Sequence, residues 1–375
     1  MRYTRLAATG LAATLALAAP LSGSLFSGSV FAQAQPREIA FDSAGDFLKL
    51  PADLHLGEVA GVATTAAGNI WVYFQGGGPN ATIGASRVYI HGGARLLEFD
   101  RSGKFLREIG TSENDRPYAF LFAQGVRVDP QNNVWIVDRA SRMVVKFDPA
   151  GKVLLTLGRR LEAVGELGSS GVFGRASGPP GSGVPGDNFN QPLDVAWDAA
   201  GNIFIPDGYG NARVAKFDKN GKFIKSWGAT GAGPGQFNTP HSVAVDAGGN
   251  VYVADMGNQR IQVFDNDGTF KTEFKNVGAP RAICISPGAQ QYLYSSNSNP
   301  DSNDSEVHKV TGQVFKMELD GKVLGKFGVP GKEPGQFSTV HGLDCRDPNA
   351  VFVTEIVEWR LQKFILHPTA AQGGK

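Results

Sequence analysis

The sequence repeats one unit six times, and this repetition constrains the fold more than any single motif does. The clearest copy is GQFNTPHSVAVDAGGNVYVADMGNQRIQVFDNDGTF, residues 235–270. Its first half alternates β-forming residues around a Gly-Asn turn and ends in Asp, as residues 195–207 also do. Its second half follows the pattern Phe-Asp-x-x-Gly-x-Phe, which recurs at residues 217–223. Each unit is therefore expected to form two hairpins.

The two ends of the repeat array complete each other. The last unit lacks its fourth strand, whereas residues 41–47 have the second-hairpin pattern with no first hairpin before them. Closure into a ring protects edges that an open array exposes. We therefore predict an all-β, six-bladed β-propeller over residues 37–368, in which the N-terminal segment supplies the outer strand of the last blade. The six first hairpins begin near Val62, Val126, Val195, Val243, Ile283 and Leu343.

The N-terminal residues have the composition of an export signal. Arg2 and Arg5 precede an Ala/Leu run at residues 6–19, and small residues close the segment near Ala32. We expect residues 1–32 to be a secretory signal and the protein to be exported, either periplasmic or secreted. That apolar run is too short to span a bilayer, and no membrane span is expected elsewhere. Residues 369–375 are expected to form a short tail.

The low net charge argues against nucleic-acid binding, and the irregular segments are expected to be loops rather than further domains. A net charge of +1 with 19% charged residues gives no basic field, so no nucleic-acid partner is expected. Insertions at residues 76–94, 159–187 and 295–311 are rich in Gly, Pro or Ser and are expected to be loops. The regularly spaced aspartates are expected to serve the turns rather than catalysis.

Only two cysteines occur, Cys284 and Cys345, and each lies in a predicted inner strand of a different repeat. Two buried free thiols are favoured over one bridge. Neither cysteine has a spacing that suggests metal binding or catalysis.

A site is expected where the inner strands begin, because those residues surround the mouth of the central channel. Blades two, four and six carry Gln124, His241 and His341 there, and alternate blades of six can bring three side chains to the axis. Three ligands with an open fourth position are typical of catalytic zinc. The alternative is that each His caps its strand or fills the channel mouth, since amides are poor zinc ligands. The six equivalent positions are Ala60, Gln124, Leu193, His241, Arg281 and His341.

A second ring of residues follows the Asp that ends each second strand. Blade three has one extra residue there, which presents Tyr209 on the same rim as the histidines. This tyrosine suits either a catalytic site or an aromatic plug over the channel. The ring consists of Gln75, Arg139, Tyr209, Met256 and Ile356.

The repeats resemble NHL repeats through the pattern P-x-x-V-A-V-D…G-N-V-Y-V-A-D…N-x-R-I-x-V-F-D in residues 236–270. More closely, NQPLDV…DGYGN…GKFI…WG in residues 190–228, followed by GQF…PHS at residues 235–242, resembles the peptidyl-α-hydroxyglycine α-amidating lyases. That family cleaves a carbinolamide to a peptide amide and glyoxylate. It uses a zinc held by three histidines, a tyrosine base and two arginines.

Carried over residue by residue, the resemblance matches His241 and His341 to two zinc ligands and Tyr209 to the base. The third ligand position is Gln124, and the two arginine positions are Gln75 and Met256. Gly342 stands where the family has an acidic calcium ligand, and Gly210 follows the tyrosine where the family has a disulfide cysteine. Zinc thus remains possible and calcium doubtful. Relocated anion contacts are conceivable at Arg139 and Arg281.

Two functions stay open. The sequence favours a non-catalytic exported propeller that binds a peptide, sugar or protein across its channel rim, since broad repeat faces suit binding. The alternative is a divergent metal-dependent lyase that cleaves a carbinolamide-type bond with His241, His341 and Tyr209.

Overall fold

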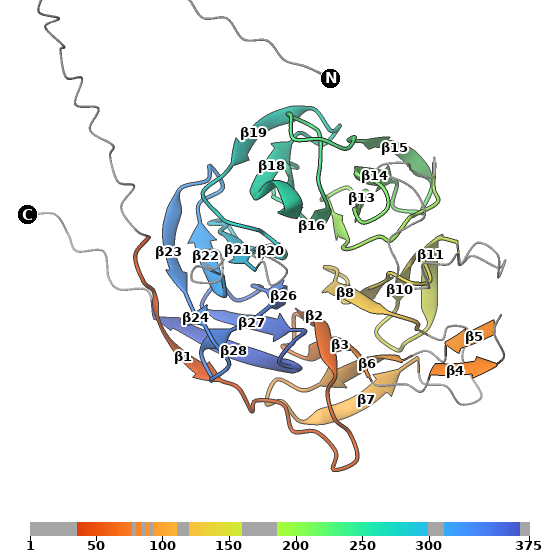
Figure 1. Cartoon of the computed structure of the whole chain (residues 1–375), viewed down its shortest axis with the longest axis vertical. Coiled ribbons are helices and arrows are strands. Elements are labelled where there is room, and N and C mark those ends of the chain that lie inside the picture. The colour runs from red at the N-terminus through yellow and green to blue at the C-terminus, as the bar shows by residue number, and fades with distance from the viewer. Residues whose placement is uncertain are drawn as a thin grey trace, which may run out of the picture. The chain divides into compact units, whose positions relative to one another are not determined.

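The computed structural model describes residues 36–76, 80–83, 87–90, 93–110, 120–159, 186–298 and 311–367. These residues form six four-stranded sheets arranged around a central axis (Figure 1). The predicted all-β, six-bladed β-propeller is therefore confirmed.

Each blade runs outward from an innermost strand at the axis (Figure 1). Blade one contains β2 (Glu58–Thr64), β3 (Ile70–Gln75), β6 (Ala94–Phe99) and β7 (Phe105–Ile109). Blade two contains β8 (Ala123–Val128), β9 (Val134–Asp138), β10 (Met143–Phe147) and β11 (Val153–Gly158). Blade three contains β12 (Ala196–Trp197), β13 (Ile203–Asp207), β14 (Arg213–Phe217) and β15 (Phe223–Trp227).

The other three blades follow in chain order. Blade four contains β16 (Pro240–Val245), β17 (Val251–Asp255), β18 (Arg260–Phe264) and β19 (Phe270–Phe274), with the 3₁₀ turn η2 (Met256–Asn258) after β17. Blade five contains β20 (Ile283–Ile285), β21 (Leu293–Asn297), β22 (Gln313–Met317) and β23 (Val323–Phe327). The short parallel pair β24 (Val329–Pro330) and β25 (Gln336–Phe337) leads to blade six, with β26 (Val340–Asp344), β27 (Ala350–Glu355) and β28 (Arg360–His367).

The N-terminal segment closes the ring as predicted. Strand β1 (Ala40–Ala44) pairs antiparallel with β28, with Phe41 opposite Leu366. The ring of Phe41 packs edge-on against Phe364 at a centroid distance of 5.2 Å. Blade six is therefore built from both ends of the array.

Aspartates and glycines of the second hairpins form the turns. Oδ1 of Asp218 accepts hydrogen bonds from the backbone nitrogens of Asn220 and Lys222 at 2.9 and 2.8 Å, and Gly221 has a φ of +83°. That φ lies in the left-handed region, which glycine adopts without steric cost. The structural role predicted for these aspartates is confirmed. The same carboxylate contacts recur at Asp100, Asp148 and Asp265.

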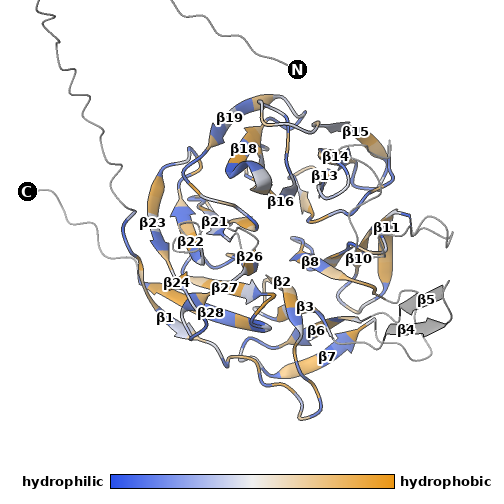
Figure 2. Ribbon diagram, viewed as in Figure 1, coloured by the Kyte–Doolittle hydropathy of each residue, from blue (hydrophilic) through white to orange (hydrophobic). Residues whose placement is uncertain are grey.

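The hydrophobic core lies between neighbouring blades. One cluster packs Trp71 and Tyr73 of blade one against Ile136 of blade two, and another packs Phe204 of blade three against Val253 of blade four. Figure 2 shows hydrophobic residues along the strands of every blade. Burying one large apolar side chain contributes roughly 1.5–3 kcal/mol, so the blades stabilise one another.

The first insertion differs from the expected loop. Within residues 76–94, β4 (Asn80–Ile83) and β5 (Arg87–Ile90) pair as an antiparallel hairpin. The β-forming residues Thr82, Ile83 and Val88 explain the difference, because they favour strands despite the flanking glycines.

The expectation of two free thiols is wrong. Cys284 and Cys345 form a disulfide with a Cα–Cα distance of 6.0 Å. Cys284 lies on β20 and Cys345 directly follows β26, and these innermost strands contact each other. Neighbouring blades thus bring the two side chains to the same depth of the channel, which their sequence spacing does not reveal.

Several sequence predictions fall outside the described residues: the secretory signal at residues 1–32, the tail at residues 369–375 and most of the two later insertions. In the described part of the chain, no helix has the length and apolar character needed to cross a membrane.

Candidate functional site at the channel crown

One end of the channel, here called the crown, carries the six residues at which the inner strands begin. All six line a single cavity of about 20 Å³, which is close to the volume needed by one water molecule. The ring of blades therefore leaves very little space on the axis at this level. The six residues are Ala60, Gln124, Leu193, His241, Arg281 and His341.

β-Bulges aim three of these side chains at the axis. In β16 the pairing to β17 skips His241, in β26 the pairing to β27 skips His341, and in β8 the pairing to β9 skips Gln124. The extra residue of a bulge is left out of the strand ladder, so its side chain can be redirected. The bulge thus places a polar side chain inside the channel without breaking the hairpin.

A buried carboxylate fixes the chain segment that enters each bulge. Asp255 accepts a hydrogen bond from the backbone nitrogen of Asn238 at 2.7 Å, and Glu355 accepts one from Ser338 at 2.8 Å. Both acids end the second strand of their blade. These contacts hold the two histidine-bearing segments in equivalent positions.

Hydrogen bonds determine which nitrogen of each imidazole faces the axis. Nδ1 of His241 lies 2.7 Å from the carbonyl oxygen of Arg281, and Nδ1 of His341 lies 2.7 Å from that of Ala60. A carbonyl oxygen only accepts, so each Nδ1 carries the hydrogen and each neutral ring presents a lone pair on Nε2. The amide nitrogen of Gln124 lies 3.5 Å from Nε2 of His241 and 3.3 Å from Nε2 of His341. The structure thus brings the three predicted side chains together.

Both histidines are neutral at pH 7. Burial lowers the pKa of His241 well below its usual value, and the neighbouring His341 and Arg281 lower it further. Burial and the charge of Arg281 lower the pKa of His341 to about 3. Their ring centroids are 5.2 Å apart, so two positive charges would repel each other at this site.

Tyr209 and Arg139 lie beside His241. The Tyr209 ring packs edge-on against the imidazole at 5.9 Å, and the Arg139 guanidinium carbon lies 5.0 Å from the Tyr209 ring centroid. Burial lowers the pKa of Arg139, and the positive charge of Arg281 lowers it further. The two guanidinium groups therefore repel each other across the crown. Gly210 is needed here, because a Cβ at this position would lie 2.1 Å from Cγ of Asn190.

Gln75 and Met256 occupy positions outside the small cavity. Oε1 of Gln75 accepts a hydrogen bond from the backbone nitrogen of Ala123 at 3.2 Å, next to Gln124. Met256 begins η2, and its backbone nitrogen donates to the carbonyl of Thr239 at 3.2 Å. These contacts fix the backbone around the crown.

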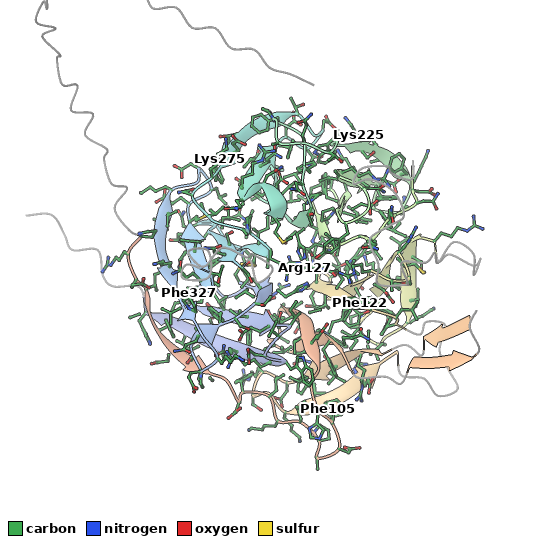
Figure 3. All side chains as sticks on the ribbon, viewed as in Figure 1. Phe105, Phe122, Arg127, Lys225, Lys275 and Phe327 are labelled. Carbon is green, nitrogen blue, oxygen red and sulfur yellow. A yellow bond between two sulfur atoms is a disulfide. The ribbon has the colours of Figure 1, made fainter. Side chains whose placement is uncertain are left out.

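Arg127 closes the channel beneath the crown, a role that none of the sequence motifs predicts. Its guanidinium forms two hydrogen bonds with the Asp194 carboxylate at 2.9 and 2.6 Å, and it also donates to the carbonyl oxygens of Leu343 and Ile283. Ser242 donates to the same carboxylate at 2.6 Å. Figure 3 shows Arg127 at the centre of the ring. Burial alone would lower the pKa of Arg127, but Asp194 raises it above its usual value.

Comparison of the repeats contains the signal for Arg127. Its position in the inner strand is occupied by a small residue or a cysteine in four other blades, and blade six has Asp344 there. Two positions earlier in each inner strand, directly after the crown residue, Asp194 is the sole acid and the other blades have Gly, Ala or Ser. A charged residue at a repeat position that is small or apolar in the other blades therefore predicts a side chain that fills the channel. The equivalent small or cysteine positions are Ala63, Ala196, Ala244 and Cys284.

The described crown does not provide a three-imidazole zinc site. It offers two Nε2 lone pairs and a carboxamide, and amides bind zinc poorly. The described residues contain no group of three or more His, Cys, Asp or Glu placed to hold a metal. A side chain at Gly342, the position of the family's calcium ligand, would place its Cβ 2.7 Å from Oγ1 of Thr354 and 3.0 Å from the carbonyl of Ala60. A side chain at this position would therefore require Thr354 and the backbone of Ala60 to shift.

Comparisons with known proteins agree with the repeat architecture. A family model described as a 6-bladed beta-propeller matches residues 190–329. The mouse NHL repeat-containing protein 3 is 32% identical over 284 residues, covering 72% of this chain and 72% of the mouse protein. The rat peptidylglycine alpha-amidating monooxygenase is 29% identical over 331 residues, covering 83% of this chain. The chain spans only 30% of the rat protein's length.

A likeness to a solved structure supports the fold alone. The structure of XC5397 from Xanthomonas campestris, described as a gluconolactonase, has a TM-score of 0.54 and 15% sequence identity. The match covers 89% of this chain and 96% of that protein.

Proposed function

The chain belongs to the NHL-repeat family of β-propellers, and we propose that it is an exported binding propeller. A carboxylate-bearing ligand, such as the end of a peptide, would bind across the rim of the crown, above the small cavity. The observation that carries this proposal is the position of Gln124, whose amide nitrogen lies within 3.5 Å of both imidazole Nε2 atoms. A carboxamide nitrogen has two hydrogens, one for each imidazole lone pair. An amide thus stands where the sequence resemblance implies a third zinc ligand.

Electrostatics at the crown favour an anion. Arg281 lines the cavity, and Arg139 lies close enough to feel its charge. The two neutral imidazoles add no charge, and burial strengthens the interaction of a guanidinium with a carboxylate. Tyr209 and Phe122, which both stack near Arg139, add aromatic surface for the rest of the ligand.

The test compares two peptides that differ only at the C-terminus. A short peptide with a free carboxylate is expected to bind in titration calorimetry, and its C-terminal amide to bind at least about tenfold more weakly, because one charge-assisted pair contributes roughly 1.5–3 kcal/mol. Arg281→Gln and Arg139→Gln should each weaken binding of the acid. The exposed Arg101 provides a control, since Arg101→Gln should leave binding unchanged. Equal binding of acid and amide would rule the proposal out.

A divergent metal-dependent lyase is the second candidate. Its support is the anchoring of both histidines through Nδ1, an arrangement that metal-binding histidines commonly share. Zinc measured by mass spectrometry in protein purified without chelator separates the two candidates. One zinc per chain that is lost in His341→Ala, together with turnover of an α-hydroxyglycine peptide, favours the lyase. Zinc-free protein that binds the acid peptide favours the binding propeller.

Export rests on residues 1–32 and is supported by the disulfide, because disulfides persist mainly in oxidising compartments. The N-terminus of the mature protein, determined by mass spectrometry in its natural host, should begin close to Ala32. A mature chain that retains Met1 would contradict export.

A further inference from the structure

The channel has a second cavity on the opposite side of Arg127 from the crown. Its volume is about 230 Å³, and Arg127 lines both this cavity and the crown cavity. Apolar side chains at the far ends of the inner strands form most of its wall, among them Val128, Trp197, Val245 and Ile285. An engineered apolar cavity of about 150 Å³ accommodates benzene, so this space is large enough for one ring or branched chain.

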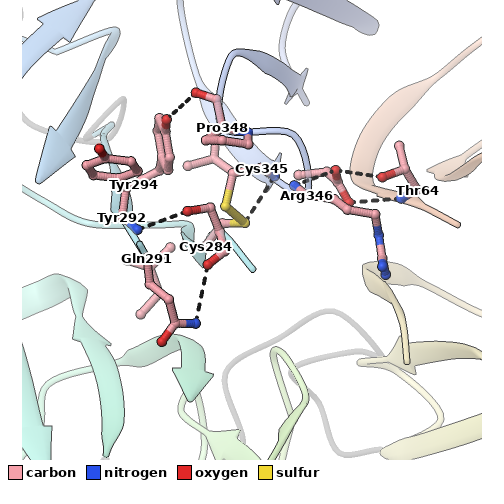
Figure 4. The surroundings of a disulfide bond; sticks show 12 residues. Thr64, Cys284, Gln291, Tyr292, Tyr294, Cys345, Arg346 and Pro348 are labelled. Carbon is pink, nitrogen blue, oxygen red and sulfur yellow. Dashed lines mark hydrogen bonds between the residues drawn. A yellow bond between two sulfur atoms is a disulfide. The ribbon is translucent and has the colours of Figure 1, made fainter. Parts of the chain in front are cut away.

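Arg346 supplies the polar group of this lower cavity. The residue follows Cys345, and its side chain points away from the disulfide (Figure 4). It reaches from blade six to blade two, where one Nη donates to the carbonyl of Val128 at 3.1 Å. Nε of Arg346 is buried without a hydrogen-bond partner in the described part of the chain. No carboxylate of the described residues lies within ion-pair distance of this guanidinium. A buried donor without a partner costs about 1–3 kcal/mol, which a ligand acceptor would recover.

The nearby acid is already engaged. Asp344 accepts hydrogen bonds from the backbone nitrogen and hydroxyl of Thr64 at 2.8 and 2.9 Å, and from the backbone nitrogen of Arg346 at 3.2 Å (Figure 4). Arg127 forms an ion pair with Asp194, whose carboxylate accepts two of its hydrogen bonds. Among the charged side chains that line the cavity, Arg346 is therefore the one with hydrogen-bond donors left for a ligand.

We propose that the lower cavity binds a small monocarboxylate with an apolar body, such as an aromatic or branched-chain acid. The carboxylate accepts hydrogen bonds from the Arg346 guanidinium, and the apolar body fills the space between the valines and Ile285. This site is separate from the crown, because Arg127 and its partners lie between the two cavities. The inference does not depend on the function proposed for the crown.

Phenylacetate and isovalerate are the probes, and titration calorimetry or ligand-observed NMR is the measurement. At least one of these acids is expected to bind one site per chain, and phenylacetamide to bind at least tenfold more weakly than phenylacetate. Arg346→Gln should reduce binding of the acid at least tenfold. Val245→Phe should abolish binding by filling the cavity, and it serves as a second variant if Arg346→Gln fails to fold.

Two controls separate this site from the crown. Arg281→Gln should leave phenylacetate binding unchanged, and Arg346→Gln should leave binding of a carboxylate-ended peptide unchanged. The inference is overturned if neither acid binds, if acid and amide bind equally, or if binding survives in both Arg346→Gln and Val245→Phe. Loss of phenylacetate binding in Arg281→Gln, with no loss in Arg346→Gln, assigns the acid to the crown and also overturns it.

Discussion

A carboxamide nitrogen carries two hydrogens, whereas a metal ion carries none and accepts lone pairs. Gln124 therefore satisfies His241 and His341 by donating to them. The backbone carbonyls at both Nδ1 atoms hold the rings in the same tautomer that a metal requires. One side-chain change separates the two kinds of site.

Gln124→His should create a zinc site. The bulge that aims Gln124 at the axis would aim an imidazole at the same point, which gives three nitrogen ligands. We expect about one zinc per chain after dialysis against zinc, measured by mass spectrometry, and a raised Tm that chelator reverses. Gln75→His is the matched control, because Gln75 lies outside the cavity. A Gln124→His protein with no more zinc than Gln75→His contradicts this geometry.

The buried histidines should make stability depend on pH. An unfolded histidine titrates near pH 6.5, whereas His341 in the folded protein has a pKa of about 3. Between these values the unfolded chain binds a proton that the folded chain does not, so stability present above pH 6.5 is lost as pH falls toward 3. At pH 5 the loss from His341 is about 2 kcal/mol relative to pH 7.

Urea unfolding at pH 7 and pH 5 measures this effect. His341→Gln should lose about 2 kcal/mol less than the wild type between the two pH values. His55 is exposed, so His55→Gln should behave like the wild type. Asp207 acts in the opposite direction, since burial raises its pKa to about 6, but it is present in every variant and cancels in the comparison. Identical pH dependence in the two variants would show that His341 is not buried neutral.

At the scale of elements, the inner strands exchange charged contacts across the channel. Arg127 of β8 reaches the carboxylate of Asp194 in blade three and carbonyls of blades five and six. Removing one partner of a buried pair leaves an uncompensated charge, which costs about 3–5 kcal/mol. The contacts between strands of different blades therefore depend on one guanidinium.

Arg127→Met should lower the free energy of unfolding by about 3–5 kcal/mol, because it leaves Asp194 buried and unpaired. Combining it with Asp194→Asn should restore most of that loss, as measured by urea unfolding. The surface pair of Lys322 with Glu318 gives a control, since the Lys322 side chain is 64% exposed and Lys322→Met should leave the free energy of unfolding almost unchanged. Additive losses in the double variant would contradict the pairing.

At the scale of the whole molecule, the disulfide joins the innermost strands of blades five and six. Cys284 and Cys345 are separated by 61 residues, and closing a loop of that length in the unfolded chain corresponds to about 4 kcal/mol in the chain-entropy model. The double variant Cys284→Ala and Cys345→Ala should therefore have a Tm several degrees lower. Reducing agent should lower the Tm of the wild type toward that of the variant and leave the variant unchanged. A variant as stable as the oxidised wild type would contradict this.

Sequence reasoning reached the architecture because the repeat is local and regular. The turn residues fix each hairpin, and the unpaired segment at residues 41–47 reveals how the ring closes. It also brought Gln124, His241 and His341 together, since alternate blades face one axis. What the repeat spacing does not specify is how far along the channel each side chain lies, because a one-residue bulge shifts it. The histidine tautomers, the disulfide and the Arg127 contacts all depend on that position.

The position of Arg127 across the axis determines whether a small molecule can pass through the central channel. A propeller channel with an open bore would let a compound enter at one face and leave at the other. Here Arg127 and Asp194 interrupt the channel, so a ligand must enter and leave each cavity through the same face of the propeller. A large molecule seated on the crown therefore blocks exchange at the crown alone, and the opposite face stays free to fill and empty at its own rate.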